Sequence, residues 1–410
     1  MEILGKYKNG NYNVTIFSNG TKVRVNNLDY FEPEFPENID IKITDYCNRG
    51  CSMCHEGSTK FGRHGDILNI PFLDTLHPHT ELAIGGGDPL SHPDLVQFLI
   101  ELKKRKIISN ITIDQDCFIS NFEFIQELIN EKLIYGIGVS LHRSPTYEFI
   151  SKISKFPNAV IHTINGINTV DEFEILAHNN LKVLILGYKN IRRGKSHLKC
   201  NSKDVAEKQS ELYDVLPHIV EQNWFNAISF DNLAIEQLDV RRLIPREEWE
   251  EFYMGEDGAH TMYVDLVEKK FAMNSTSMER YPITDNIVEM FSIVSGKQVP
   301  DCNIRKKVYN FISRFTSNGK RLEVIDAFTN GCCYWFAEVL FMRFWMDNDS
   351  DIANGMSIMY DQVANHFGCR INGRVYDISG DVTDDYKWEE YDGLKDEALT
   401  KILERDCILF

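Results

Sequence analysis

The stretch Ile41–Cys54 reads Ile-Lys-Ile-Thr-Asp-Tyr-Cys-Asn-Arg-Gly-Cys-Ser-Met-Cys, a short apolar run followed by closely spaced cysteines. The spacing of Cys47, Cys51 and Cys54 lets one loop hold three thiolates against one side of a cuboidal iron–sulfur cluster. A fourth cysteine would close such a cluster for electron transfer, whereas three leave one iron open to bind another ligand. Gly50 lets the loop bend between the ligands without a steric penalty. The stretch therefore predicts a 4Fe-4S cluster with one open iron.

These cysteines allow two other interpretations. They could be buried thiols without a ligand, or part of a zinc site that His55 completes. A structural zinc site usually has a second ligand pair farther along the chain, and His55 directly follows Cys54, which is awkward for tetrahedral closure. The iron–sulfur interpretation is favoured.

A glycine-rich loop ends the next apolar run, where Ile84–Pro89 reads Ile-Gly-Gly-Gly-Asp-Pro. Glycines let backbone groups approach a ligand closely, and free amides and carbonyls can bind a zwitterion. Glycine runs are common in turns, but this one lies at a strand end about 30 residues beyond the cysteine loop. Its position makes it a candidate ligand-binding loop.

The two loops together resemble those of the radical S-adenosylmethionine superfamily, and the resemblance covers about residues 1–240. It implies that the methionine amine and carboxylate bind the open iron. It also implies that reduction of the sulfonium releases a 5′-deoxyadenosyl radical, which abstracts hydrogen from a substrate. A flavodoxin or ferredoxin would supply the electron.

The same resemblance implies a set of residues for S-adenosylmethionine, namely Gly85, Gly86, Gly87, Asp88, Ser140 and Gly187. Asp88 replaces the glutamate of the superfamily's Gly-Gly-Glu-Pro loop. Met53 stands where an aromatic residue is common in the superfamily. Ser140 could instead be a serine that caps a turn at a strand end.

Apolar strand-like runs alternate with amphipathic helical stretches from about residue 40, which favours right-handed βαβ units and a parallel sheet. The expected fold is α/β, a partial (β/α)6-type barrel with ligands at the carboxyl ends of its strands. The expected strands are 41–44, 81–84, 111–114, 136–140, 159–164 and 182–186, with 227–230 as a possible seventh.

Four domains or segments are expected along the chain. Residues 1–35 form a β-hairpin extension, with turn signals at Asn9-Gly10 and Asn19-Gly20. Residues 36–240 form the partial barrel, and 241–320 form an irregular connecting region on the substrate side. Residues 321–410 form a smaller α+β domain, which begins after the surface-turn signal at 317–320.

The carboxyl-terminal section contains a possible second active site. Cys333 opens a helical pattern, and a helix start favours the thiolate form of a cysteine. The Asn372-Gly373 turn predicts a hairpin that brings His366 and Asp377 to one face. Cysteine, histidine and aspartate in this order resemble papain-like and transglutaminase-like domains, with Cys333 as nucleophile, His366 as base and Asp377 as the residue that orients it.

Two alternatives for this section stay open. It could be a structural cap with a buried cysteine pair. It could also hold an auxiliary cluster that uses Cys302, Cys332 or Cys333, Cys369 and Cys407.

Composition narrows the partners. The net charge is -17 with a pI of about 5.2, which disfavours non-specific binding of nucleic acid. No apolar run reaches membrane-spanning length, and the start lacks a secretion signal, so a cytoplasmic location is expected. The sequence does not identify the substrate, and the expected classes are a peptide, or a nucleotide or sugar whose phosphate could bind the basic cluster 192–195.

Overall fold

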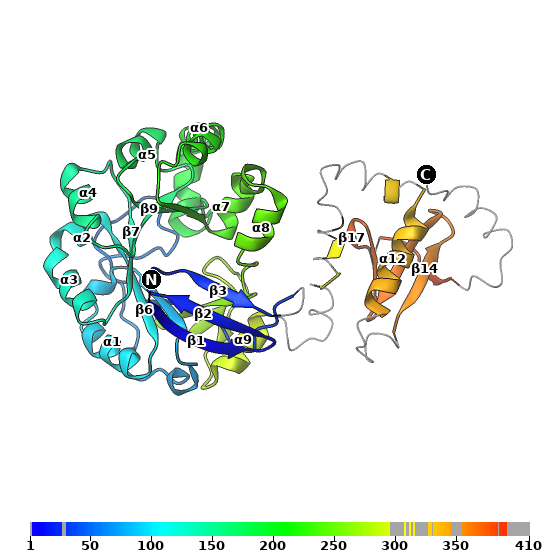
Figure 1. Ribbon diagram of the computed structural model, residues 1–410, viewed down its shortest axis with the longest axis horizontal. Helices are drawn as coiled ribbons and strands as arrows, with labels where there is room; N and C mark the ends of the chain where they lie inside the picture. Colours follow the sequence, from blue (N-terminus) through cyan, green and yellow to red (C-terminus); the bar gives the residue numbers. More distant parts are fainter. Residues whose placement is uncertain are drawn as a thin grey trace. The chain divides into compact units, whose positions relative to one another are not determined.

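The computed structural model describes residues 2–26, 30–295, 307–308, 311–312, 315, 327–329, 331–345, 355–383 and 385–391. The chain divides into two compact units, Met1–Ser295 and Gly296–Phe410, which are called the amino-terminal and carboxyl-terminal units (Figure 1).

The amino-terminal unit is built on a ten-stranded sheet in the order β10-β9-β8-β7-β6-β5-β4-β11-β12-β13. Seven neighbouring strands are parallel and confirm the strands expected from the sequence. They are β4 (Asn38–Thr44), β5 (Glu81–Gly86), β6 (Ile108–Asp114), β7 (Gly136–Ser140), β8 (Ala159–Ile164), β9 (Lys182–Leu186) and β10 (Ala227–Phe230). The α/β class is confirmed. The described sheet is open, with β10 and β13 at its edges, and does not close into a barrel.

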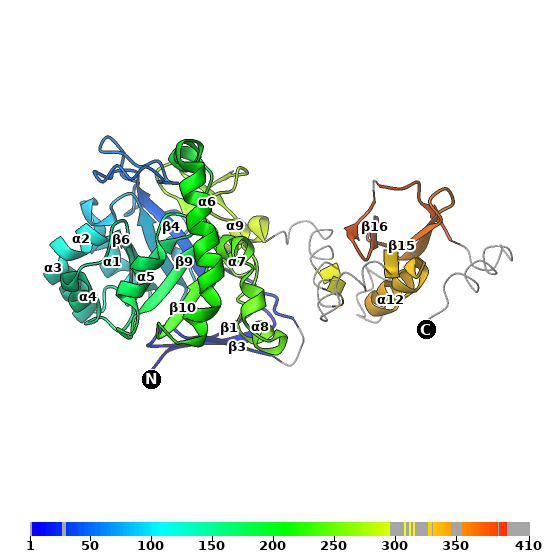
Figure 2. The same ribbon diagram turned by 90° about the horizontal axis from the view of Figure 1, so that it is seen from above.

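Helices cover the outer face of this sheet (Figures 1 and 2). They are α1 (Leu95–Lys104), α2 (Gln115–Ser120), α3 (Phe122–Asn130), α4 (Tyr147–Ile153), α5 (Val170–Leu176), α6 (Arg192–Glu221) and α7 (Asn232–Gln237). Strand residues alternate between the two faces. On β5, Leu82 and Ile84 are fully buried in the core beneath the helices, whereas Ala83 and Gly85 line a cavity on the inner face.

Three further strands extend the sheet beside β4. They are β11 (Thr261–Asp265), which is parallel to β4, and the antiparallel β12 (Lys270–Ala272) and β13 (Tyr281–Pro282). They lie in the segment 241–320 that the sequence pattern left irregular. The remaining helices of this unit are α8 (Arg246–Phe252), α9 (Ile287–Val294), η1 (Leu73–Thr75), η2 (Pro89–Ser91) and η3 (Val240–Leu243).

The amino-terminal residues form a separate three-stranded antiparallel sheet of β1 (Ile3–Asn9), β2 (Tyr12–Phe17) and β3 (Lys22–Val25). The expected turn signals at Asn9-Gly10 and Asn19-Gly20 fall where these strands meet, so the segment forms two consecutive hairpins where one was expected. Buried Glu37 joins this sheet to the start of β4, because it accepts hydrogen bonds from Tyr12 at 2.5 Å and Arg24 at 2.8 Å. Burial alone would raise the pKa of Glu37, but His260, Lys22 and Arg24 together lower it.

The carboxyl-terminal unit packs the helix α12 (Cys333–Trp345) on a five-stranded sheet in the order β17-β16-β15-β14-β18. The strands are β14 (Ser357–Asp361), β15 (His366–Ile371), β16 (Arg374–Asp377), β17 (Gly380–Asp381) and β18 (Glu389–Glu390). Apolar residues of α12 and β15, among them Phe336 and Ile371, form its core. Asn372 and Gly373 both have positive φ, as the expected two-residue turn requires.

Candidate functional site

A cavity of about 730 Å³ lies against the inner face of the main sheet. Alternate residues of all seven parallel strands line it, so the sheet is concave on this side. The strand β7 contributes three small residues, Gly136, Gly138 and Ser140, together with Ile137. The missing side chains leave room, because a Cβ on Gly138 would lie 2.4 Å from the ring of His162.

The cysteine loop follows β4 at the carboxyl end of the strand, and Cys47, Cys51 and Cys54 all line the cavity as free, partly buried thiols. Burial raises the pKa of Cys47 and Cys51, and the proximity of the other thiols raises it further. Among the described residues, no three histidine, cysteine or acidic side chains converge on a point that would hold a single metal ion. A cuboidal cluster needs a wider arrangement, because each thiolate binds a different iron. Three thiols facing one cavity have the donor chemistry for it.

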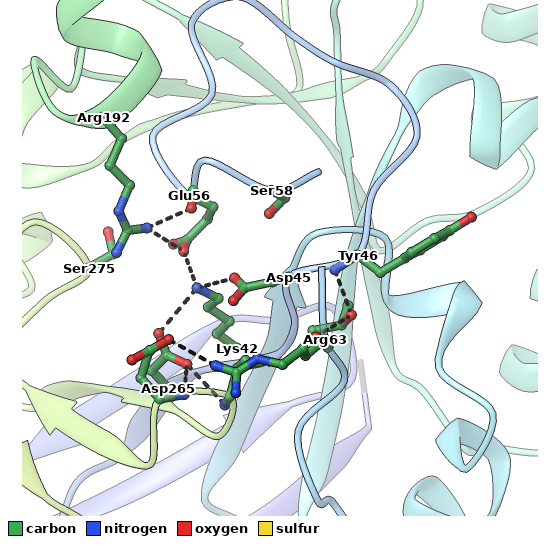
Figure 3. Close-up of polar contacts among 12 residues, drawn as sticks. Lys42, Asp45, Tyr46, Glu56, Ser58, Arg63, Arg192, Asp265 and Ser275 are labelled. Carbon is green, nitrogen blue, oxygen red and sulfur yellow. Dashed lines mark hydrogen bonds and ion pairs between the residues drawn. The ribbon is translucent and has the colours of Figure 1, made fainter. Parts of the chain in front are cut away.

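A buried lysine lies at the base of this loop (Figure 3). The ammonium of Lys42 is 2.5 Å from Asp45, 3.1 Å from Glu56 and 3.2 Å from Asp265. Burial would lower the pKa of Lys42, but these carboxylates raise it overall. Asp45 and Glu56 flank the three cysteines in the sequence, and Asp265 ends β11. One cation therefore ties both ends of the cysteine loop to the sheet.

Two arginines at the start of α6 bind the same loop, and Figure 3 shows the first of them, Arg192. Arg192 donates to the Glu56 carboxylate at 3.1 Å and to its carbonyl at 2.8 Å. Arg193 donates to the carbonyls of Cys51 at 3.0 Å and Ser58 at 2.8 Å. From the sequence, this basic cluster was a candidate for binding the phosphate of a substrate. In the structure its two guanidinium groups are bound to the cysteine loop.

The role of Arg193 can be tested by the release of iron from protein loaded with iron and sulfide. Arg193→Gln removes charge-assisted hydrogen bonds to two loop carbonyls, each worth about 1.5–3 kcal/mol. We expect anaerobic iron release to a chelator to become about 10-fold faster or more. Lys195→Gln, a change at an exposed cation of the same helix, should leave the rate unchanged. Equal rates in the wild type and Arg193→Gln would show that the arginine does not hold the loop.

The three glycines at the carboxyl end of β5, Gly85, Gly86 and Gly87, have different surroundings. A Cβ on Gly86 would lie 2.5 Å from the carbonyl oxygen of Thr44, and one on Gly87 would lie 2.1 Å from that of Tyr46. Gly87 also donates its N–H to Thr44 at 2.7 Å. A Cβ on Gly85 would meet no atom within 4 Å and would enter the cavity. Gly86 and Gly87 thus let the cysteine loop approach, whereas Gly85 leaves space beside it.

The other expected cofactor residues are also found near the cavity. Ser140 ends β7 and lines it, as does Gly187. Gly187 donates to the Asp231 carboxylate at 2.8 Å, and a Cβ there would lie 2.5 Å from Leu233 of α7. The Asp88 carboxylate accepts from the N–H of Leu90 at 3.2 Å and from Cys117 at 3.4 Å, so it caps the turn η2.

Sequence reasoning did not find Lys189 or Arg49 as parts of this site. Lys189 lines the cavity and donates to Ser275 at 3.0 Å. Arg49 lies within the cysteine loop and pairs with Asp114 at the end of β6, at 2.9 Å. The sequence contained enough information to predict the pair of Arg49 and Asp114. A loop that follows one parallel strand and an aspartate that ends another lie at the same edge of the sheet.

The second group of expected residues lies in the carboxyl-terminal unit. His366 and Asp377 are both buried, and His366 Nε2 lies 2.9 Å from Asp377 Oδ2. Cys333 begins α12 and is also buried. Burial would lower the pKa of His366, but hydrogen bonds with Asp377 and Cys333 raise it to about 9.

No family model matches the sequence, and no curated protein matches it. Two solved structures of SuiB from Streptococcus suis, one bound to the precursor peptide SuiA and one to S-adenosylmethionine, align with 64% of this chain. Each alignment has 15% identity and a TM-score of 0.43. It covers 66% of SuiB, so this chain spans just under two thirds of that protein in both complexes.

A third SuiB structure aligns with 72% of this chain and 88% of SuiB, at 12% identity and a TM-score of 0.47. Structural similarities at these TM-scores define no family. None of them supports the resemblance of the carboxyl-terminal unit to papain-like domains. The assignment of function therefore rests on the residues of this chain. None of the helices in the described residues is long and apolar enough to cross a membrane.

Proposed function

We propose that the amino-terminal unit is a radical S-adenosylmethionine enzyme. The observation that supports this most is the meeting of two loops at one cavity. The thiols of Cys47, Cys51 and Cys54 and the backbone of Gly85–Gly87 line the same space at the carboxyl edge of the parallel strands. This edge is where open α/β sheets bind ligands.

In this proposal the three cysteines hold a 4Fe-4S cluster and leave one iron open. When bound, the cluster supplies the electron that cleaves S-adenosylmethionine to a 5′-deoxyadenosyl radical, which takes hydrogen from the substrate. Gly85 and the neighbouring backbone receive the methionine part, with Ser140 and Gly187 farther along the cavity. A flavodoxin or ferredoxin is the proposed reductant.

The chain's own residues have three tasks here. Lys42, Arg192 and Arg193 hold the cysteine loop in one conformation. The loop must be fixed because all three cluster ligands lie on it. Asp88 holds the glycine loop through η2 rather than the ligand. Lys189 and His162 lie on the wall beyond the loops, where the cation and a neutral imidazole can bind polar substrate groups. Burial and the charge of Lys189 lower the pKa of His162 to about 4.

A peptide, or a nucleotide or sugar, is the proposed substrate class. Lys189, one of the cations on the cavity wall, donates a hydrogen bond to the hydroxyl of Ser275, and its charge suits a carboxylate or a phosphate. Both groups occur in these substrates.

The proposal is tested by anaerobic loading of the full chain with iron and sulfide. We expect a brown protein with a broad visible absorption shoulder, which forms 5′-deoxyadenosine when S-adenosylmethionine and dithionite are added. Cys51→Ala should lose the colour and the product, and Cys200→Ala, which changes an exposed cysteine, should keep both. Fully loaded wild-type protein that forms no 5′-deoxyadenosine would refute the proposal.

A further inference from the structure

The carboxyl-terminal unit contains a cysteine at the start of a long helix. Cys333 begins the 13-residue α12, after Gly331 with a φ of 119°. The first backbone N–H groups of a helix have no partner within the helix, and they favour negative charge nearby. The same amides can bind the oxygen of a carbonyl under attack.

The neighbouring strands supply a histidine and an aspartate. Cys369 of β15 pairs with Tyr376 of β16, so Gly368 lies opposite Asp377 and His366 is its diagonal neighbour. His366 Nε2 meets Asp377 Oδ2 at 2.9 Å, and the other carboxylate oxygen accepts from the N–H of Ser379 at 2.7 Å. Asp377 is therefore fixed, and it fixes the ring of His366.

The thiol of Cys333 lies near the ring of His366 and, together with Asp377, raises the pKa of this histidine against the effect of burial. Since Asp377 engages Nε2, the nitrogen left for the thiol is Nδ1. The helix α12 packs on β15 and β16, so Cys333 lies beside the hydrogen-bonded pair of His366 and Asp377.

The two alternatives explain this arrangement less well. An auxiliary cluster would need Cys302 and Cys407, which lie outside the described residues, and Cys369, which is fully buried and has a pKa raised by burial. A purely structural role does not explain why a buried thiol, imidazole and carboxylate lie next to one another. Apolar residues would fill the same core without the cost of removing polar groups from water.

We propose that Cys333, His366 and Asp377 form a second centre, which performs thiol-dependent acyl transfer or hydrolysis on the carbonyl of an ester, thioester or amide. Cys333 and His366 are the catalytic residues, and Asp377 is a positioning residue. The centre is independent of the radical function proposed for the amino-terminal unit.

The reaction has two balanced steps. Cys333 Sγ attacks the carbonyl carbon and forms a thioester, while the bond to the leaving group breaks and His366 gives that group its proton. Water then attacks the thioester, His366 takes a proton from the water, and the S–C bond breaks to release the acid and the thiolate. An amine or alcohol in place of water gives transfer.

Two aromatic rings define one side of this centre. Tyr386 stacks on His366 with ring centroids 4.8 Å apart, and Trp388 lies 6.1 Å from the same ring. An acyl group with an apolar or aromatic side chain would pack against them, which favours such substrates over small polar acids.

The first experiment measures alkylation of the full chain by iodoacetamide, with each cysteine peptide quantified by mass spectrometry. An ordinary thiol with a pKa of about 8.5 is less than about 1% ionised at pH 6. Cys333 should therefore react at least about 10-fold faster than its neighbour Cys332 at pH 6. Its rate should stay flat from about pH 6 to 8, because His366 remains protonated up to about 9.

Variants separate catalysis from structure. His366→Asn should slow the alkylation of Cys333 about 10-fold or more at pH 6 and leave that of Cys332 unchanged. Asp377→Asn should lower the upper limit of the flat region, because it removes a contact that raises the pKa of His366. A Cys333 rate in the wild type that rises with pH like that of Cys332 would overturn the proposal without any variant.

The second experiment adds p-nitrophenyl acetate and follows nitrophenolate release. We expect a burst of about one equivalent per chain, with the acetyl group on Cys333. Cys333→Ala should abolish the burst, and Cys332→Ala should retain it. The burst should also persist in Cys51→Ala, which distinguishes failure of this centre from failure of the radical function. Absence of acetyl-Cys333 in the wild type would contradict the proposal.

Discussion

Lys42→Met is expected to destabilise the amino-terminal unit by about 3–5 kcal/mol, because loss of one partner from a buried ion pair leaves uncompensated charge. Lys42 is 3% exposed, and the carboxylate of Asp265 is fully buried. The expected decrease in Tm is roughly 6–20 °C. Iron content after loading should also fall, since Asp45 and Glu56 are released at both ends of the cysteine loop.

A matched control and a double variant test the cause of this loss. Lys104→Met changes an exposed lysine paired with Glu101 and should alter stability by no more than about 1 kcal/mol. Asp265→Asn keeps the Oδ1 that accepts from the N–H groups of Val267 and Glu268 and removes the charge. Lys42→Met with Asp265→Asn should therefore be more stable than Lys42→Met alone. A double variant that is less stable would contradict the charge argument.

The effect should depend on pH in a defined direction. Burial would raise the pKa of Glu56, but His55 and Lys42 lower it overall, so the stability from this group is present above about pH 4.3 and is lost as the pH falls. The pKa of Lys42 is raised, so its stability is present below about pH 10.4. The difference between wild type and Lys42→Met should be greatest between about pH 5 and 10 and should narrow below about pH 4. Urea unfolding at each pH measures it.

The sequence predicted the repeating part of the fold well, because each parallel strand carries its own signal. Runs such as 136–140 and 182–186 are short, apolar and bounded by helical stretches, so local pattern decides them. The Asn372-Gly373 turn likewise set the register that joins His366 to Asp377. Both are local features that need no knowledge of distant residues.

The parts that the sequence did not predict depend on distant contacts. The strand β11 pairs with β4, which lies more than 200 residues earlier, and its five residues carry no pattern that names this partner. Lys42 and Asp45 both lie within the quoted cysteine stretch, but Glu56 and Asp265 come from outside it. Arg192 and Arg193 read as a free basic patch because their acceptors are mostly backbone carbonyls, which have no sequence signature.

Gly87→Ala is expected to prevent retention of the cluster, whereas Gly85→Ala should leave the cluster in place and weaken S-adenosylmethionine binding. Neither glycine has a positive φ, so backbone strain is equal and only space differs. A methyl group on Gly87 would lie 2.1 Å from the carbonyl oxygen of Tyr46, and the cysteine loop would have to move. Such overpacking costs about 1–3 kcal/mol or more.

The methyl group of Gly85→Ala meets no atom within 4 Å and occupies cavity volume instead. Its iron content should equal that of the wild type, and stability should change by no more than about 0.5 kcal/mol. Affinity for S-adenosylmethionine, measured by anaerobic equilibrium dialysis, should fall about 10-fold, the effect of about 1.4 kcal/mol of steric conflict. Equal loss of iron in both variants would mean that Gly85 also contacts the loop. Unchanged affinity in Gly85→Ala would contradict this prediction. The added methyl group would then not touch S-adenosylmethionine, which would have to bind elsewhere in the cavity.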